Sequence, residues 1–236
     1  MRGPYGFELN ESCCTCKLRA DGFFCQLPTN TLKDLDDLGS SSAYPAGAVL
    51  FLEKQNSRGV YVLCEGQVKL SISSSEGKTI ILRIAKAGEV LGLMAALSGS
   101  SHEVTAETLH PCQVVFIYRD DFLRFLTQHP EAYQNMVKQL NVEYQSVFEQ
   151  LRTIGLSPSV PGRLAKLLLG WSVGGQQTKS GTKFNISLTH EEIAECIGVT
   201  RETVSRIFGE FKIQHLVTLR GSTVTIPSRA ALEHLC

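Results

Sequence analysis

The sequence lacks a long hydrophobic run, an excess of one charge sign and any compact catalytic motif. Its 236 residues contain no stretch of about 18 apolar residues, which excludes a membrane-spanning helix. The first residues, 1–6, lack the apolar segment of a secretory signal, so we expect a cytoplasmic protein. The six histidines are dispersed, and there is no phosphate-binding glycine loop and no Ser/His/Asp arrangement with supporting glycines. The sequence therefore argues against an enzyme.

What is present divides the chain into segments of different periodicity. Residues 1–29 form a cysteine-rich leader, and residues 30–128 contain short β-branched runs separated by glycines, which predicts a β-roll or jelly roll. Residues 129–156 have the spacing of one long helix, and the helix breakers that follow it begin a last domain at 157–236. The expected fold class is α+β.

The long helix carries a narrow apolar stripe whose members are three or four residues apart. The stripe consists of Met136, Leu140, Tyr144, Val147, Leu151 and Ile154. This spacing favours the seam of a homodimer, and the alternative is packing against the chain's own β-roll. Glu143 lies near the edge of the stripe, either as a control point facing its symmetry mate or as a solvated glutamate at the rim.

The most specific pattern lies in residues 191–208 and predicts a helix-turn-helix. Ala194 is the small residue that lets two helices cross closely, and Gly198, four residues later, tolerates the positive φ of the turn. Thr200 can cap the second helix. Apolar residues stand at the positions expected to be buried, namely Ile193, Ile197, Val199, Val204 and Ile207.

The second helix of this motif carries side chains suited to reading DNA. Arginine binds guanine with two hydrogen bonds and glutamate accepts from cytosine, so we predict DNA contacts from a set near its N-terminus. The set is Thr200, Arg201, Glu202, Ser205 and Arg206. The alternative is an ordinary solvated helix with Glu202 paired to Arg206. Runs at 216–219 and 223–226 predict a β-hairpin wing, on which Arg220 could contact phosphate.

The order of β-roll, long helix and winged helix-turn-helix resembles the CRP/FNR family of bacterial transcription regulators, with the most specific match at residues 200–207. The resemblance implies a cyclic-nucleotide-binding-domain-like β-roll and a homodimer that binds a pseudo-palindromic site in double-stranded DNA. It also implies RNA polymerase as a partner. Arg201 and Arg206 would contact guanines, and Glu202 a cytosine.

The charge distribution is compatible with this partner. The whole chain has 23 basic and 23 acidic residues, but residues 157–236 carry a formal charge of +3 and residues 1–156 carry −3. Because +3 is modest, we expect affinity to depend on base contacts and symmetry more than on bulk attraction.

The resemblance leaves the effector open. Family members that bind cyclic nucleotides carry an Arg-Ser or Arg-Thr pair in the β-roll, and here that pair falls on His102 and Glu103. No arginine lies between Arg83 and Arg119, so the sequence argues against cyclic nucleotide binding.

The FNR branch of the family instead holds an iron–sulfur cluster with leader cysteines and one β-roll cysteine. By this resemblance the candidate ligands are Cys13, Cys16, Cys25 and Cys112, with Cys14 as an alternative fourth ligand. Zinc, a thiol/disulfide switch and a leader without cofactor remain alternatives, as does a small organic effector in the β-roll. Cys64 is interpreted as a small core residue on a strand.

Overall fold

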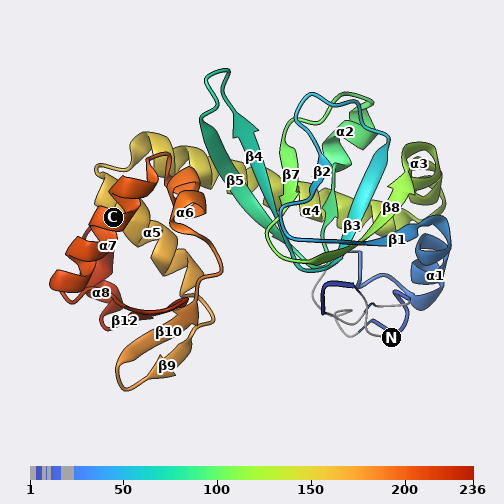
Figure 1. Ribbon diagram of the computed structural model, residues 1–236. Helices are drawn as coiled ribbons and strands as arrows, with labels where there is room; N and C mark the ends of the chain where they lie inside the picture. Colours follow the sequence, from blue (N-terminus) through green and yellow to red (C-terminus); the bar gives the residue numbers. More distant parts are fainter. Residues whose placement is uncertain (1–3, 7–8, 10–11, 17–23) are drawn as a thin grey trace. The chain divides into compact units, whose positions relative to one another are not determined.

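Two four-stranded antiparallel sheets form the N-terminal half of the protein, as a computed structural model shows (Figure 1). The structure describes residues 4–6, 9, 12–16 and 24–236. The first sheet contains, in order, β1 (Ser40–Tyr44), β8 (Cys112–Tyr118), β3 (Gly59–Glu65) and β6 (Val90–Leu91). The second contains β2 (Val49–Phe51), β7 (Thr105–Thr108), β4 (Gln67–Ser73) and β5 (Thr79–Lys86). The β-roll predicted from the glycine-separated runs is confirmed.

Alternation along β3 and β8 separates two apolar cores. In β3, Val62 contributes to one core and Leu63 to the other. In β8, Val115 and Ile117 belong to the core with Val62, whereas Val114 belongs to the core with Leu63. Because neighbouring strand residues point to opposite faces, a shift of one position moves a side chain from one core to the other.

Helices cover the face of the first sheet that carries Val62. They are α1 (Thr29–Leu38), α3 (Arg119–Gln128) and the first turns of α4 (Pro130–Leu156). Leu35 of α1, Phe122 of α3 and Met136 of α4 are buried in one cluster with strand residues of this face. A short helix, α2 (Leu93–Ser98), follows β6, and a 3₁₀ turn, η1, covers Pro4–Gly6.

The C-terminal part contains a helix-turn-helix and a third four-stranded sheet. Its helices are α5 (Val160–Trp171), α6 (His190–Ile197), α7 (Arg201–Ile213) and α8 (Arg229–Glu233). The strand order is β11 (Thr218–Arg220), β12 (Thr223–Ile226), β10 (Gly181–Asn185) and β9 (Gln176–Thr178). The predicted wing is the hairpin of β11 and β12, which turns at Gly221 with φ of +59°.

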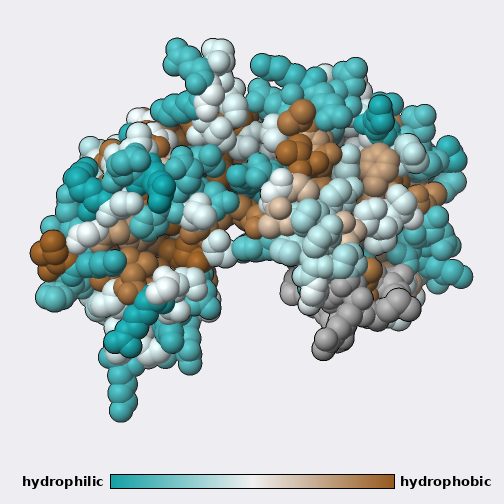
Figure 2. Space-filling view, viewed as in Figure 1, coloured by the Kyte–Doolittle hydropathy of each residue, from teal (hydrophilic) through white to brown (hydrophobic). Residues whose placement is uncertain are grey.

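The chain divides into two compact units. The first consists of Met1–Ile72 with Leu82–Val147, and the second of Ser73–Ile81 with Phe148–Cys236. On the displayed face of each unit, hydrophilic side chains predominate and apolar ones gather in patches (Figure 2). Among the described residues, no helix has the length and apolar character needed to cross a membrane.

Candidate functional site

Local interactions build the turn between α6 and α7. Thr189 and Glu192 form a capping box at the start of α6, each side chain accepting from the other residue's backbone N–H. Gly198 ends α6 at φ of +70°, the left-handed conformation that side chains resist, and the Val199 N–H donates to the Ala194 carbonyl (3.1 Å). Ala194 is 1% exposed, so the small residue lies at the helix crossing as predicted.

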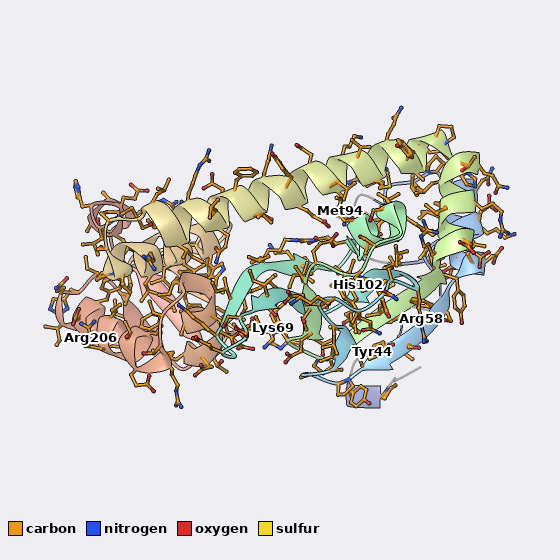
Figure 3. The ribbon with its side chains drawn as sticks, turned by 90° about the horizontal axis from the view of Figure 1, so that it is seen from above. Tyr44, Arg58, Lys69, Met94, His102 and Arg206 are labelled. Carbon is orange, nitrogen blue, oxygen red and sulfur yellow. The ribbon has the colours of Figure 1, made fainter. Side chains whose placement is uncertain are left out.

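The start of α7 presents polar side chains to solvent. The Thr200 hydroxyl accepts from the Thr203 N–H and caps the helix, while Val204 and Ile207 are fully buried. The side chains predicted to read bases are exposed, namely Arg201, Glu202, Ser205 and Arg206. The helix-turn-helix therefore offers one charged face, with Arg206 at the outer edge of the second unit (Figure 3).

Two of these side chains are already oriented in the free protein. The Arg206 guanidinium pairs with Glu210 one helical turn later. The Glu202 carboxylate has a pKa below its usual range because it accepts hydrogen bonds from its own backbone N–H and from Thr200. Glu202 is therefore ionised near neutral pH and available as an acceptor for a cytosine amino group. Arg220 is exposed at the end of β11, next to the turn of the wing.

A second candidate site is a pocket lined by cysteines in the first unit. Cys13, Cys16 and Cys25 line it from the leader, and Cys64 lines it from β3. The backbone N–H of Cys13 donates to the Asp36 carboxylate of α1 (3.2 Å). The three predicted leader ligands thus line one pocket with Cys64, which lies on a strand and packs against the core as expected.

Two thiols in this pocket, those of Cys13 and Cys64, resist ionisation. Burial raises the pKa of Cys64 to about 12, and neighbouring Cys25, Cys16 and Asp36 add to the shift. Burial, then Cys64 and Asp36, raise the pKa of Cys13 in the same way. A thiol that stays protonated is a poor nucleophile and is slow to oxidise, unless a bound cation reverses the local electrostatics.

Cys112, the predicted fourth ligand, does not line this pocket. It is fully buried in the core of the opposite sheet face, where its thiol donates to the carbonyls of His110 (3.1 Å) and Gln67 (3.4 Å). The next residue on β8, Gln113, lines the cysteine pocket, so Cys112 points away from it. The predicted alternative, Cys14, is also outside the pocket lining, with its thiol 3.9 Å from the Thr29 carbonyl.

The β-roll segment that binds phosphate in cyclic-nucleotide members has an aromatic residue at its centre here. Gly92 precedes α2 at φ of +80°, and the buried His102 ring stacks on Phe51 with centroids 3.9 Å apart (Figure 3). Burial lowers the pKa of His102, which favours the neutral ring. The Arg119 side chain donates to the Ala96 carbonyl of α2 (2.7 Å). By the resemblance, His102 is the residue at the position of the arginine in those members, and burial favours its neutral ring.

The stripe predicted on α4 is rotated in the structure. Met136 is 2% exposed and Leu140 packs partly against the same core, so both face their own β-roll and not a partner. Ile154 is half-buried, and its side chain approaches Gly198. Five exposed apolar residues of α4 form a row that we call the α4 stripe: Tyr133, Val137, Tyr144, Phe148 and Leu151. Val142, Val147 and Leu156 are also exposed but lie outside this row. Of the predicted residues, Tyr144, Val147 and Leu151 are exposed.

Glu143 is bound to side chains of its own chain. Its carboxylate accepts from Arg83 of β5 (2.8 Å) and from Gln139 (2.8 Å), and Arg83 also pairs with Glu89. The fully buried Gln139 side chain accepts from the Val90 N–H and donates to the Val90 carbonyl. Burial raises the pKa of Glu143, although Arg83 opposes the shift. This network ties α4 to β5 and β6.

Replacing Arg83 by methionine is expected to destabilise the first unit, because two partly buried carboxylates lose their shared cation. We expect the free energy of unfolding to fall by about 3 kcal/mol near neutral pH. The raised pKa of Glu143 means that protonation favours the folded state, so part of the loss should return as the pH falls through that pKa. Urea unfolding at several pH values measures this. Adding Glu143→Gln should remove the pH-dependent part, and an unchanged pH dependence in the double variant contradicts the assignment to Glu143.

Comparison with known proteins agrees with these two parts of the chain. Residues 42–129 match the family model of the cyclic nucleotide-binding domain, and residues 162–235 match the Crp-like helix-turn-helix domain. The cAMP-activated global transcriptional regulator CRP of Pasteurella multocida is 24% identical over 184 residues, covering 78% of this chain and 88% of the relative. The CRP-like cAMP-activated global transcriptional regulator of Mycobacterium tuberculosis H37Rv is 26% identical over 184 residues, covering 78% and 82%.

Solved structures of the same architecture are also similar. FixK2 from Bradyrhizobium japonicum has a TM-score of 0.72 at 20% identity, covering 84% of this chain and 96% of that one. The regulator CLP from Xanthomonas campestris has a TM-score of 0.75 at 18% identity, covering 85% and 100%. These similarities concern the fold, while the matched domains and the named relatives identify a regulator and not an enzyme. Since the β-roll domain, the long helix and the Crp-like helix-turn-helix occur in the order predicted, the chain belongs to the CRP/FNR family of transcription regulators.

Proposed function

We propose that this regulator is a homodimer whose DNA binding responds to oxygen or redox state through an iron–sulfur cluster. The cluster would be held by Cys13, Cys16, Cys25 and Cys64. The observation that carries the proposal is that the three leader cysteines and Cys64, which is distant from them in sequence, line one pocket. Four thiolates are the usual ligand set of such clusters, which supply the sensitivity to oxidants.

The cysteine thiols that line the pocket are of the ligand type that an iron–sulfur cluster requires. Their side chains are farther apart in this structure than the ligands of one metal site. Within the described ranges, no three His, Cys, Asp or Glu side chains are near enough together to hold a metal ion. The raised pKa values of Cys13 and Cys64 disfavour direct thiol oxidation as the signal, since both thiols are protonated in the absence of a cation. A metal-bound state is therefore preferred over a simple disulfide switch.

Helix α1 offers a route from the pocket to α4. Its Asp36 accepts from the Cys13 backbone at one end. Near the other end, the buried Thr31 hydroxyl donates to Glu131 at the start of α4 (2.5 Å), and Asp34 lies 3.2 Å from the ring of His129. A change in the leader that moves α1 would thus act directly on the first turn of α4, which supports control of the dimer helix by the sensor.

The DNA-binding role rests on the exposed start of α7. In a homodimer formed along α4, two copies of this helix would enter successive major grooves about 34 Å apart and read a pseudo-palindromic site. Arg201 and Arg206 are proposed to bind guanines and Glu202 a cytosine, with Arg220 on a phosphate. We propose that the dimer acts in the cytoplasm and contacts RNA polymerase at promoters.

Anaerobic purification tests the sensor. We expect iron and acid-labile sulfide in the protein, a broad visible absorption band that air bleaches, and a 5- to 150-fold change in DNA affinity on bleaching, the range of about 1–3 kcal/mol typical of coupled sites. A colourless protein, with zinc or without metal, whose DNA affinity is the same before and after air exposure contradicts the sensor. Footprints without two-fold symmetry contradict the dimeric reader.

A further inference from the structure

His190, the first residue of α6, is bound to the DNA-reading helix. Its Nδ1 lies 2.9 Å from the Ser205 hydroxyl on α7, a hydrogen-bond distance. Its ring is also stacked on Phe208, with centroids 5.2 Å apart and 16° between the planes. Two independent contacts therefore hold the imidazole against α7, beside an exposed side chain that we propose to touch a base.

The direction of the His190–Ser205 hydrogen bond decides what Ser205 offers to DNA. A serine hydroxyl has one hydrogen to donate and lone pairs to accept with. If Nδ1 accepts, that hydrogen is used, and only lone pairs remain for the amino groups of adenine or cytosine. If Nδ1 carries a proton, Ser205 accepts from the ring, and its own hydrogen is available for thymine O4 or guanine O6.

We propose that His190 is a specificity-determining residue, which sets the donor or acceptor character of Ser205 and thereby the base preference at one position of each half-site. With a neutral ring protonated on Nε2, Ser205 presents lone pairs and favours adenine or cytosine. With a protonated ring, it presents a hydrogen and favours thymine or guanine. The inference rests on the DNA contact proposed for Ser205.

The surroundings of His190 favour the neutral ring in the free protein. Burial lowers its pKa, and the charges of Arg201 and Lys212, both on α7, act in the same direction. From its own helix, the neighbouring Glu191 and Glu192 carry the opposite charge. The imidazole is therefore mostly neutral near pH 7 and becomes charged on acidification, within the range in which histidines titrate.

The test compares base discrimination, not overall affinity, in full-length protein. A DNA site is first selected by the wild type from a random duplex library. Ser205→Ala then identifies the base pair at which discrimination depends on this hydroxyl, and four duplexes varying only there are the probes. His190→Phe keeps a ring against Phe208 but has no nitrogen for Ser205. We expect it to reduce discrimination about 2- to 10-fold, the usual effect of one hydrogen bond, and to have no further effect in the Ser205→Ala background.

Acidity provides a second readout. Between about pH 8 and pH 5.5, wild-type preference at this base pair should move from adenine or cytosine toward thymine or guanine, while His190→Phe shows no such movement. The proposal is overturned if His190→Phe weakens all four duplexes equally, which indicates packing alone, or if its effect persists without the Ser205 hydroxyl.

This experiment distinguishes a failure of the role proposed for His190 from a failure of the DNA-reading function proposed for α7. If Ser205→Ala changes no base preference while Arg206→Ala does, the role of His190 is rejected and the DNA-reading function of α7 stands. If the library yields no selected site at all, the proposed function itself fails. Circular dichroism of each variant ensures that the comparisons are made between folded proteins.

Discussion

Cys64→Ser is expected to abolish the proposed iron–sulfur cluster, while Cys112→Ser leaves it in place. The two residues are a matched pair, since both are cysteines on adjacent, hydrogen-bonded strands of one sheet. Cys64 lines the pocket with the three leader cysteines, whereas Cys112 is buried in the opposite core. A serine hydroxyl is a poor substitute for a thiolate ligand, but at position 112 it can still donate to the His110 or Gln67 carbonyl.

Iron and sulfide content per chain, with the anaerobic visible spectrum, measure this prediction. We expect the iron of Cys64→Ser to fall to the background of a protein without cluster, and its DNA affinity to become insensitive to air. Cys14→Ser is a second control, because Cys14 is also in the leader yet lies outside the pocket lining. Retention of the full cluster in Cys64→Ser, or its loss in Cys112→Ser, would contradict the proposed set of four ligands.

The helix-turn-helix was predictable because its determinants are local. Ala194, Gly198 and Thr200 lie within seven positions, and each satisfies a requirement of backbone geometry that neighbouring residues impose. The β-roll was predictable for a similar reason, since glycines separate short alternating strands. The β9–β10 hairpin and the helices α2 and α3 have weaker local signals and were not anticipated.

The choice of the fourth cysteine depends on information that is not local. Whether Cys64 or Cys112 faces the leader is decided by the pleat of two strands and by the register that pairs Leu63 with Val114. A shift of one residue would exchange the faces. Alternation along β8 predicts that Cys112 and Gln113 lie on opposite faces of the sheet. It does not predict which of the two faces the leader covers, because that depends on the packing of Phe24 and α1.

The same difficulty explains the rotation of the α4 stripe. At about 100° per residue, the residues bound to the chain's own core, such as Ala132 and Gln139, lie roughly 120° around the helix from Tyr144 and Leu151. Both rows contain residues three and four positions apart, and Met136 lies between them. Periodicity therefore predicts a long amphipathic helix but cannot assign each row to the β-roll or to a partner.

Leu151→Glu is expected to dissociate the proposed homodimer and to remove most of its specific DNA affinity. Leu151 is 65% exposed on α4, in the same row as Tyr144, which is also 65% exposed. At a two-fold seam, each substitution places two carboxylates in an apolar contact, where burial of unpaired charge is strongly unfavourable.

We expect the dimer dissociation constant to rise at least about 100-fold, and affinity for a palindromic site to fall by about 1,000-fold, toward the level of non-specific binding. Sedimentation equilibrium measures the first effect and titration of a palindromic duplex the second. Gln145→Glu is the matched control, since it adds the same charge at an exposed position of α4 roughly 100° away from the stripe. A monomeric wild type, or equal weakening by both variants, contradicts a seam along these residues. If Leu151→Glu dissociates the dimer and Gln145→Glu does not, the α4 stripe is the row that joins two regulators on one DNA site.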